Sequence, residues 1–190
     1  MSFSQCVRAS VWVCLLLAFA SSSSATTIYG LNNPIGAGGV TGTIETDGTI
    51  GALSAANITD WNLVIDDGSS TFNLLGPLSG NNSQLLVSPG VGFSATATQL
   101  LFDFGGNLGG VLFQNPNIGS SQNWYAFEDQ ADGIGTGVPG SENLRVGFGV
   151  RMSSVRSGTA VIGIVPEPST ALLLGVGLLG LAARRRRRKA

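Results

Sequence analysis

The strongest constraint on this chain is an uncharged, largely apolar run close to its C-terminus. The run covers fifteen residues, Ser169 to Ala183, and ends on a basic cluster that consists of Arg184, Arg185, Arg186, Arg187, Arg188 and Lys189. As a helix it would be about 22 Å long, which is short of a hydrocarbon core of about 30 Å. Long arginine side chains that reach the headgroups, together with local bilayer thinning, make up part of the difference. The pattern predicts one transmembrane span, residues 169–183, with the arginines as a cytoplasmic stop-transfer signal and the rest of the chain outside.

The charge distribution along the chain supports this division. Six of the ten basic residues lie in the last seven positions. Residues 26–165 carry three arginines and ten acids, a formal charge of −7. Segments of such different charge are expected to face different environments. An acidic middle also argues against nucleic-acid binding, which needs a basic surface.

A short proline motif stands directly before the apolar run. Val165 is followed by Pro166, Glu167, Pro168 and Ser169, and the two prolines make this a stiff element. The order of Val-Pro-Glu-Pro-Ser, a single Gly/Leu-rich span and a terminal arginine cluster resembles the PEP-CTERM sorting signal of Gram-negative and related bacteria. The resemblance covers residues 165–190. An ordinary membrane anchor explains the span and the arginines, but it gives no reason for Pro-Glu-Pro at the membrane face.

The resemblance implies recognition by an exosortase, a membrane-embedded cysteine-type processing enzyme that cuts near the Pro-Glu-Pro element. Pro166, Glu167 and Pro168 are then recognition residues for that partner, and the upstream protein is released or transferred. It also implies association with exopolysaccharide and biofilm production.

The first 25 residues have the features of a secretory signal peptide. Arg8 precedes an apolar run of ten residues, Val11 to Ala20, which is too short to span a bilayer, and small residues follow up to Ala25. We place the cleavage after Ala25, with Ala20 as the alternative position. The protein is therefore expected to be exported, anchored for a time in the inner membrane with its ectodomain in the periplasm, and then sorted to the surface or the extracellular space.

The residue types of the ectodomain exclude much of enzyme chemistry. The chain contains no histidine, and its two cysteines, Cys6 and Cys14, lie in the signal peptide. Acyl-transfer triads and thiolate sites are therefore excluded. No pair of carboxylates has a spacing that singles it out for glycoside hydrolysis. We expect a protein that is not an enzyme and that has no cofactor.

Residues 26–164 consist of short apolar or β-branched runs separated by Gly, Asn, Asp and Pro. The pattern predicts an antiparallel, all-β sandwich or jelly-roll-like domain of eight or nine strands. The clearest alternation runs from Leu144 to Met152 and predicts one half-buried strand. Asp47-Gly48 is interpreted as a hairpin turn. Asn115 to Ser121 and Asp129 to Ser141 are expected to be long loops.

The other predicted strands are supported by the same reasoning. One face of a strand is formed by Trp61, Leu63 and Ile65, with a return strand near Thr71 to Leu75. The remaining predicted strands are Val40 to Thr46, Gln84 to Val87, Thr96 to Phe104, Gly110 to Phe113, Asn123 to Phe127 and Gly158 to Ile164. Parts of this domain, Thr41 to Leu63 and Ser94 to Phe104, resemble a recurrent extracellular domain that occurs with such sorting signals and has no assigned activity.

Two constellations have a functional and a structural interpretation. Acids near turns, Asp66 with Asp67 and Glu128 with Asp129 and Asp132, suit Ca²⁺, but no EF-hand pattern is present and solvated turn acids are favoured, so no metal site is expected. Trp61 shares its strand face with Leu63 and Ile65, which favours core packing. Adjacent Trp124 and Tyr125 point to opposite sides of a strand, so the alternation leaves open that one of them is exposed and contacts a glycan, but a structural role is favoured for this pair too.

The sequence therefore predicts an exported, exosortase-processed protein whose role is structural or adhesive in an extracellular polysaccharide matrix. Its expected partners are the processing enzyme, the inner membrane and an exopolysaccharide. The alternative is a carbohydrate-binding module that is sorted to the surface.

Overall fold

A computed structural model describes residues 25–106, 109–115, 122–129 and 139–166. These residues form thirteen strands and one 3₁₀ turn, η1 (Ala55–Asn57). The strands are β1 (Thr27–Ile35), β2 (Gly38–Thr46), β3 (Gly51–Ala52), β4 (Ile58–Asp66), β5 (Thr71–Leu75), β6 (Gln84–Val87), β7 (Phe93–Ala95), β8 (Gln99–Asp103), β9 (Gly110–Asn115), β10 (Asn123–Glu128), β11 (Ser141–Arg145), β12 (Met152–Val155) and β13 (Thr159–Ile164).

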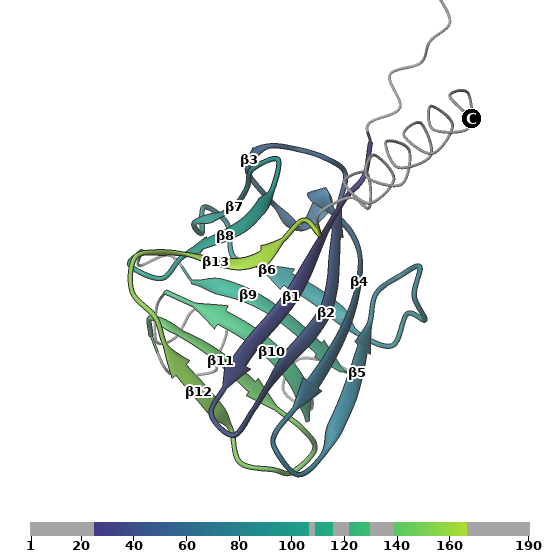
Figure 1. Ribbon diagram of the computed structural model, residues 1–190, viewed down its shortest axis with the longest axis vertical. Coiled ribbons are helices and arrows are strands. Elements are labelled where there is room, and N and C mark those ends of the chain that lie inside the picture. The colour runs from purple at the N-terminus through teal and green to yellow at the C-terminus, as the bar shows by residue number, and fades with distance from the viewer. Residues whose placement is uncertain (1–24, 107–108, 116–121, 130–138, 167–190) are drawn as a thin grey trace, which may run out of the picture.

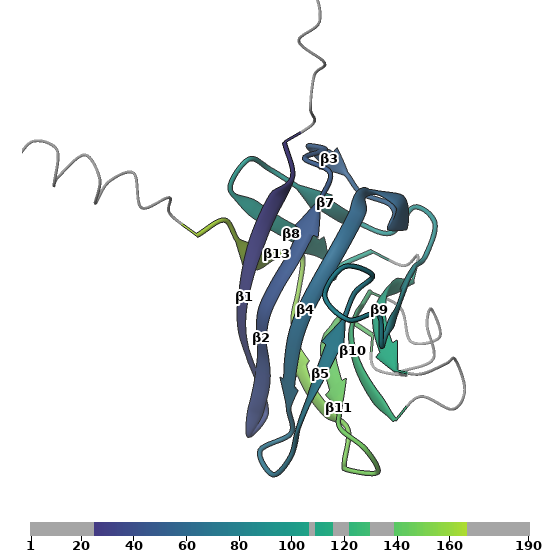
Figure 2. The same ribbon diagram turned by 90° about the vertical axis from the view of Figure 1, so that its right-hand side faces the viewer.

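The strands form two sheets that pack face to face. The larger sheet has eight strands in the order β3-β7-β8-β13-β1-β2-β4-β5, and the smaller has five in the order β12-β11-β10-β9-β6. Every strand pair in both sheets is antiparallel. Figure 1 shows β1, β2, β4 and β5 in front of β9, β10 and β11, and Figure 2 shows the two layers from the side. The predicted all-β sandwich is confirmed, but the predicted number of eight or nine strands is wrong, because the described residues form thirteen.

The core lies between the two sheets and is rich in aromatic rings. Trp61 of β4 meets Phe113 of β9 with ring centroids 5.4 Å apart, and Phe102 of β8 meets Phe127 of β10 at 5.0 Å. Both pairs join one sheet to the other in the edge-to-face arrangement that aromatic rings prefer. Trp61 is therefore a core residue, as its strand face predicted.

Strands with a regular apolar alternation lie where the sequence places them. Gln84–Val87 is the whole of β6, and the predicted hairpin from Trp61 to Leu75 is formed by β4 and β5. The predicted strands at Val40, Thr96, Gly110, Asn123 and Gly158 correspond to β2, β8, β9, β10 and β13. The segments predicted as long loops, Asn115 to Ser121 and Asp129 to Ser141, fall mostly outside the described residues.

The prediction of one continuous strand from Leu144 to Met152 is wrong. The chain leaves β11 after Arg145, turns, and returns as β12 from Met152, with Leu144 paired to Met152. Gly147 has φ of 57° and the N–H of Gly149 donates to the carbonyl of Val146 at 3.0 Å, so the glycines close a tight hairpin. Leu144 and Val146 are buried and Met152 packs against the core, but Phe148 and Val150, at the turn, do not belong to a buried face.

The interpretation of Asp47-Gly48 as a hairpin turn is also wrong. β2 pairs with β1 and with β4, whereas β3, which follows Asp47-Gly48, pairs with β7. Gly48 does adopt a positive φ of 83°, but it starts a wide connection to β4. The Asp47 N–H donates to the carbonyl of Asn57 at 3.0 Å and closes this connection.

Close contact between β2 and β4 requires glycine at specific positions. A Cβ on Gly42, whose φ is 127°, would lie 2.0 Å from the carbonyl oxygen of Asn62. A Cβ on Gly38 would lie 2.0 Å from the carbonyl oxygen of Asp66. The glycines of this strand are thus needed for the packing of the larger sheet.

The two ends of the sandwich are different. β1 starts and β13 ends at one end, because Gly30 pairs with Ile164. At the other end, three hairpin turns come together (Figure 1). A Cβ on Gly36 would lie 2.6 Å from Cε of Met152, and one on Gly149 would lie 2.5 Å from Oδ2 of Asp67. We call these the exit end and the hairpin end.

Candidate functional site

The chain leaves the exit end through Val165, which is still part of the folded domain. Its N–H donates to the carbonyl of Thr98 at 2.8 Å, and its side chain packs against the core. The turn that holds Thr98 is itself fixed, because the Tyr29 hydroxyl donates to the carbonyl of Thr96 at 2.7 Å and Thr96 Oγ1 accepts from the Gln99 N–H at 2.9 Å. The chain is therefore held up to the residue before the proline motif.

Pro166 lies on the outer face of the larger sheet. A Cβ on Gly30 would be 3.7 Å from Cγ of Pro166, so the ring lies over this glycine. Pro166 lines a depression of about 500 Å³ together with Gly30, Val161 and Ile164. Among the residues of the predicted motif, Pro166 is described, whereas Glu167, Pro168 and the arginines 184–188 lie outside the described residues.

The folded domain and the predicted membrane span are separated by very little chain. Ser169, where the predicted span begins, is three residues beyond Pro166. Three extended residues reach at most about 10 Å. If residues 169–183 span the membrane as predicted, the exit end lies close to the membrane face while the signal is attached.

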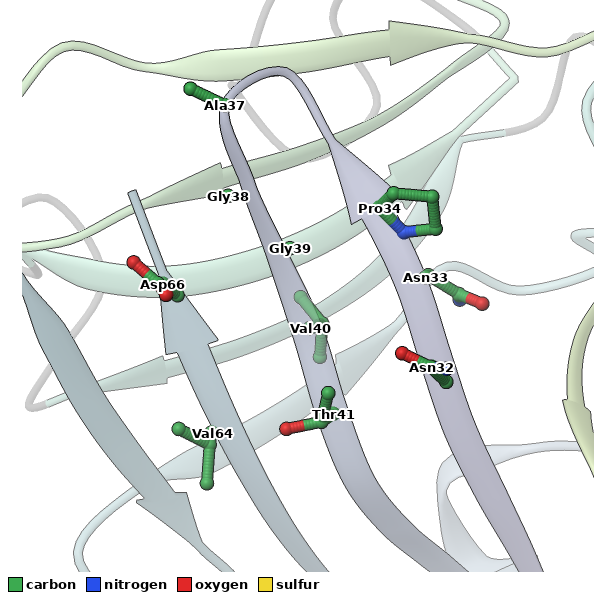
Figure 3. A pocket seen from close by; sticks show the side chains of 10 residues that line it. All are labelled: Asn32, Asn33, Pro34, Ala37, Gly38, Gly39, Val40, Thr41, Val64 and Asp66. Carbon is green, nitrogen blue, oxygen red and sulfur yellow. The ribbon is translucent and has the colours of Figure 1, made fainter. Parts of the chain in front are cut away.

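A second depression lies beside the first on the same outer face. It has a volume of about 570 Å³ and is lined by β1, β2 and β4 (Figure 3). Asn32, Thr41 and Asp66 contribute an amide, a hydroxyl and a carboxylate, and Gly38 and Gly39 also line it. Asn32 also lines the depression next to Pro166, so the two form one trough along β1. We call the part over β1, β2 and β4 the polar trough.

The two candidate glycan-contact residues of β10 are both buried. Tyr125 has no exposed surface and Trp124 has 9%. Tyr125 points into the core, whereas Trp124 packs with Leu112 and Ala126 on the opposite face of the smaller sheet. The opposite orientation of the two rings is as predicted, and the burial of both agrees with the favoured structural role and not with the glycan contact. The sequence shows the side to which a ring points and not what covers it.

A buried polar network, which the sequence analysis did not identify, joins the two sheets around Glu142. This carboxylate has no exposed surface and accepts hydrogen bonds from the Tyr125 hydroxyl and from Asn33 Nδ2, the latter at 2.7 Å. Arg156 completes the network with Nη2 at 2.6 Å from Oε2. Glu142 lies two residues before the buried Leu144, so the strand alternation is the signal that could have placed it on the core face.

Both tyrosines of the chain are expected to ionise at unusually high pH. Burial raises the pKa of Tyr29, and burial together with the charge of Glu142 raises the pKa of Tyr125 well above its ordinary value. An unfolded tyrosine ionises near pH 10, so above that pH the unfolded state loses protons that the folded state keeps, and stability falls as the pH rises.

The chain has only two tyrosines. Ultraviolet titration of tyrosinate should show no step near pH 10 in the folded protein and a normal step in urea. A normal step in the folded protein would contradict the burial of Tyr125.

Of the acids considered for Ca²⁺, Glu128 and Asp129 are buried, so the expectation of solvated turn acids is wrong for these two. Asp66 and Asp67 hold turns of the backbone. Asp66 Oδ1 accepts from the Gly68 N–H at 2.7 Å, and Asp67 Oδ1 accepts from the N–H groups of Ser69 and Ser70. The backbone hydrogen bond from Ser69 is the largest cause that lowers the pKa of Asp67. Asp132 lies outside the described residues. Within the described ranges, no three His, Cys, Asp or Glu side chains come together as a metal site.

The comparison with protein families identifies the C-terminal segment. Residues 165–188 match the PEP-CTERM protein-sorting motif. No curated protein and no solved structure matches the chain. Among the described residues no helix is long and apolar enough to cross a membrane, and the predicted span lies beyond them. The chain thus carries a PEP-CTERM sorting motif, which marks it as an exported protein that is sorted to the membrane or surface and processed by an exosortase.

Proposed function

We propose that this exported exosortase substrate serves as a structural or adhesive component of an extracellular polysaccharide matrix. The observation that carries the proposal is the position of the sorting motif directly at the exit end of a compact sandwich. The motif begins at Val165, which is still hydrogen-bonded to Thr98. The hairpin end and the polar trough are therefore free to meet other molecules, both before and after processing.

The composition of the domain supports this role. Ten acids and three arginines give residues 26–165 a net negative charge, and most of the remaining polar residues are uncharged. Net charge of one sign keeps an exported protein soluble and monomeric. A neutral or cationic polysaccharide would meet no repulsion from such a surface.

The alternative role, a carbohydrate-binding module, is favoured by one observation, the polar trough. Its amide, hydroxyl and carboxylate groups, at Asn32, Thr41 and Asp66, are groups that hydrogen-bond sugar hydroxyls. The depression has a volume of about 570 Å³ and extends over three strands.

We further propose that the protein is not an enzyme. Two of the described carboxylates, Glu142 and Asp60, each accept several hydrogen bonds from other groups of the protein. Glu142 is bound by Tyr125, Asn33 and Arg156, and Asp60 accepts from the Leu78 N–H at 3.0 Å and from the Ser79 hydroxyl. A carboxylate held in this way is poorly placed to transfer a proton to a substrate.

Retention of the processed protein in isolated matrix tests the proposed role. The protein should remain with the polysaccharide after washing at low salt. If the trough binds sugars, Asn32→Ala combined with Thr41→Ala should weaken binding to the purified polysaccharide about tenfold, because two hydrogen bonds are lost. Thr71→Ala, an exposed threonine at the edge strand β5, is the matched control.

The outcomes separate the two roles. Retention that does not change in the trough variant supports a structural or adhesive role without a sugar site in the trough. Retention that depends on the trough supports the binding module. A processed protein that washes out of the matrix completely contradicts both.

A further inference from the structure

The β11–β12 hairpin presents two large apolar side chains to solvent. Phe148 and Val150 are each 84% exposed. The hairpin is fixed from within by the bond from Gly149 N–H to the carbonyl of Val146, and from outside by the Gly147 N–H, which donates to Oδ1 of Asn123 at 2.8 Å. A tight hairpin with such anchors projects its apolar side chains from a defined position.

Two arginines flank this apolar tip. Leu144 and Met152 are the last residue pair between β11 and β12. Arg145 directly follows Leu144, and Arg151 directly precedes Met152. Leu144 is buried and Met152 packs against the core, so by alternation both arginines leave the sheet on its outer side. The third arginine of the described domain, Arg156, is paired with Glu142.

The charge of the tip is not neutralised within the described residues. Among the described residues, no carboxylate lies within ion-pairing distance of Arg145 or Arg151. Nε of Arg145 is buried and has no hydrogen-bond partner. Asp66 and Asp67 lie at the end of the neighbouring strand β4, where Asp66 Oδ1 accepts from the Gly68 N–H and Asp67 Oδ1 accepts from the N–H groups of Ser69 and Ser70. The tip itself, residues 145–151, contains two arginines and no acid, in a domain that is acidic as a whole.

We propose that the tip formed by residues 145–151 binds an anionic lipid surface. Phe148 and Val150 insert at the boundary between headgroups and acyl chains, and Arg145 and Arg151 pair with lipid phosphates. An acidic polysaccharide could pair with the arginines, but it offers no apolar medium to Val150 and Phe148. The lipid surface satisfies both the charge and the two apolar side chains.

The position of the tip gives this binding a consequence. The tip lies at the hairpin end, opposite the exit end where Pro166 leaves the domain (Figure 1). A chain that is anchored through its C-terminal segment can therefore contact a second lipid surface with the tip. After processing, the same tip can hold the released protein at an anionic membrane.

Binding of vesicles to the full chain in nanodiscs tests the proposal. The chain is incorporated into discs of phosphatidylcholine and immobilised by a tag at its mature N-terminus, which lies at the exit end. Vesicles of phosphatidylcholine alone, or with one part in three of phosphatidylglycerol, are then passed over it. We expect binding of the anionic vesicles only. Phe148→Ser with Val150→Ser should weaken it about tenfold or more, and Arg151→Gln about fivefold.

Matched variants and competitors define the other outcomes. Leu78→Ser with Val155→Ser replaces two other exposed apolar residues and should leave vesicle binding unchanged. Equal binding of both vesicle types, no binding, or full binding by the Phe148/Val150 variant with an unchanged melting temperature would overturn the proposal. Loss of binding in millimolar inorganic phosphate would reassign the site to a free anion, and tight binding of an acidic polysaccharide that ignores Phe148 and Val150 would reassign it to a glycan.

Discussion

Replacing Pro166, Glu167 and Pro168 with alanines should leave the full-length chain unprocessed in the membrane fraction. The motif begins at Val165, whose N–H is hydrogen-bonded to the carbonyl of Thr98 in the turn before β8. Alanine removes the two rings that fix φ and the one carboxylate between them, while the apolar run and the arginines remain. The chain is then still exported and still stopped in the membrane, but the recognition element is absent. Immunoblots of fractionated cells should show a shift from almost all processed to almost all unprocessed protein.

The control for this experiment keeps the motif and changes the chain directly after it. Thr170→Ala with Ala171→Ser conserves the length and the uncharged character of the segment, so processing should be normal. If the alanine triplet is processed like the unchanged protein, Pro-Glu-Pro is not the recognition element. The folded exit end, where Val165 is hydrogen-bonded to Thr98, would then be the next candidate, because the variant retains it.

Replacing Glu142 with alanine should lower the free energy of unfolding by about 3–5 kcal/mol, the range for one partner removed from a buried ion pair. Arg156 loses its counter-ion, and the Tyr125 hydroxyl and the Asn33 amide lose their common acceptor in the core. Asn33 retains its bond to the carbonyl of Ile162 at 3.0 Å, so part of the network survives. Urea unfolding, followed by tryptophan fluorescence, measures the change.

Glu45→Ala is the matched control for Glu142. Glu45 lies on β2, paired with Ile28 on the outer face of the larger sheet, and it is only partly buried. Its replacement should change stability by no more than about 0.5 kcal/mol. A loss below about 1 kcal/mol for Glu142→Ala would mean that the network contributes little to the joining of the two sheets.

Strands with one buried face are predictable from the sequence, because their pattern is local. Leu100, Phe102 and Phe104 alternate with less buried residues, and all three are buried where predicted. β1 lacks such a pattern and was not predicted, since it contains Asn32, Asn33 and Pro34. Pro34 is tolerated in this strand because β13 pairs with β1 only at Gly30, so no bond to β13 is lost at that position.

The errors have a common physical cause, which is that local patterns do not report tertiary contacts. Phe148 and Val150 alternate like core residues, yet Gly147 and Gly149 turn the chain and leave both exposed. Trp124 was considered for a glycan because of its strand position, but Leu112 and Ala126 pack against it. A turn decides the first case, and packing that includes Leu112 of β9 decides the second.

The same reasoning explains which parts of the candidate site could be predicted. The sorting motif is contiguous, so the sequence displays it in full from Val165 onward. The Glu142 network combines β1, β10 and β11, which are far apart in the chain, and it exists only once the sheets pack. The polar trough also needs a sheet, because Asn32, Thr41 and Asp66 come from three strands.

Intact-mass spectrometry of the mature protein tests the central claim most directly. The chain is isolated from cells that contain the exosortase and from cells that lack it, and the C-terminal residue is assigned from the mass. With the enzyme present, the mature chain should end within or beside residues 166–168 and lack the apolar run and arginine cluster. Without the enzyme, it should extend to Ala190. The same C-terminus in both strains would contradict processing through this motif.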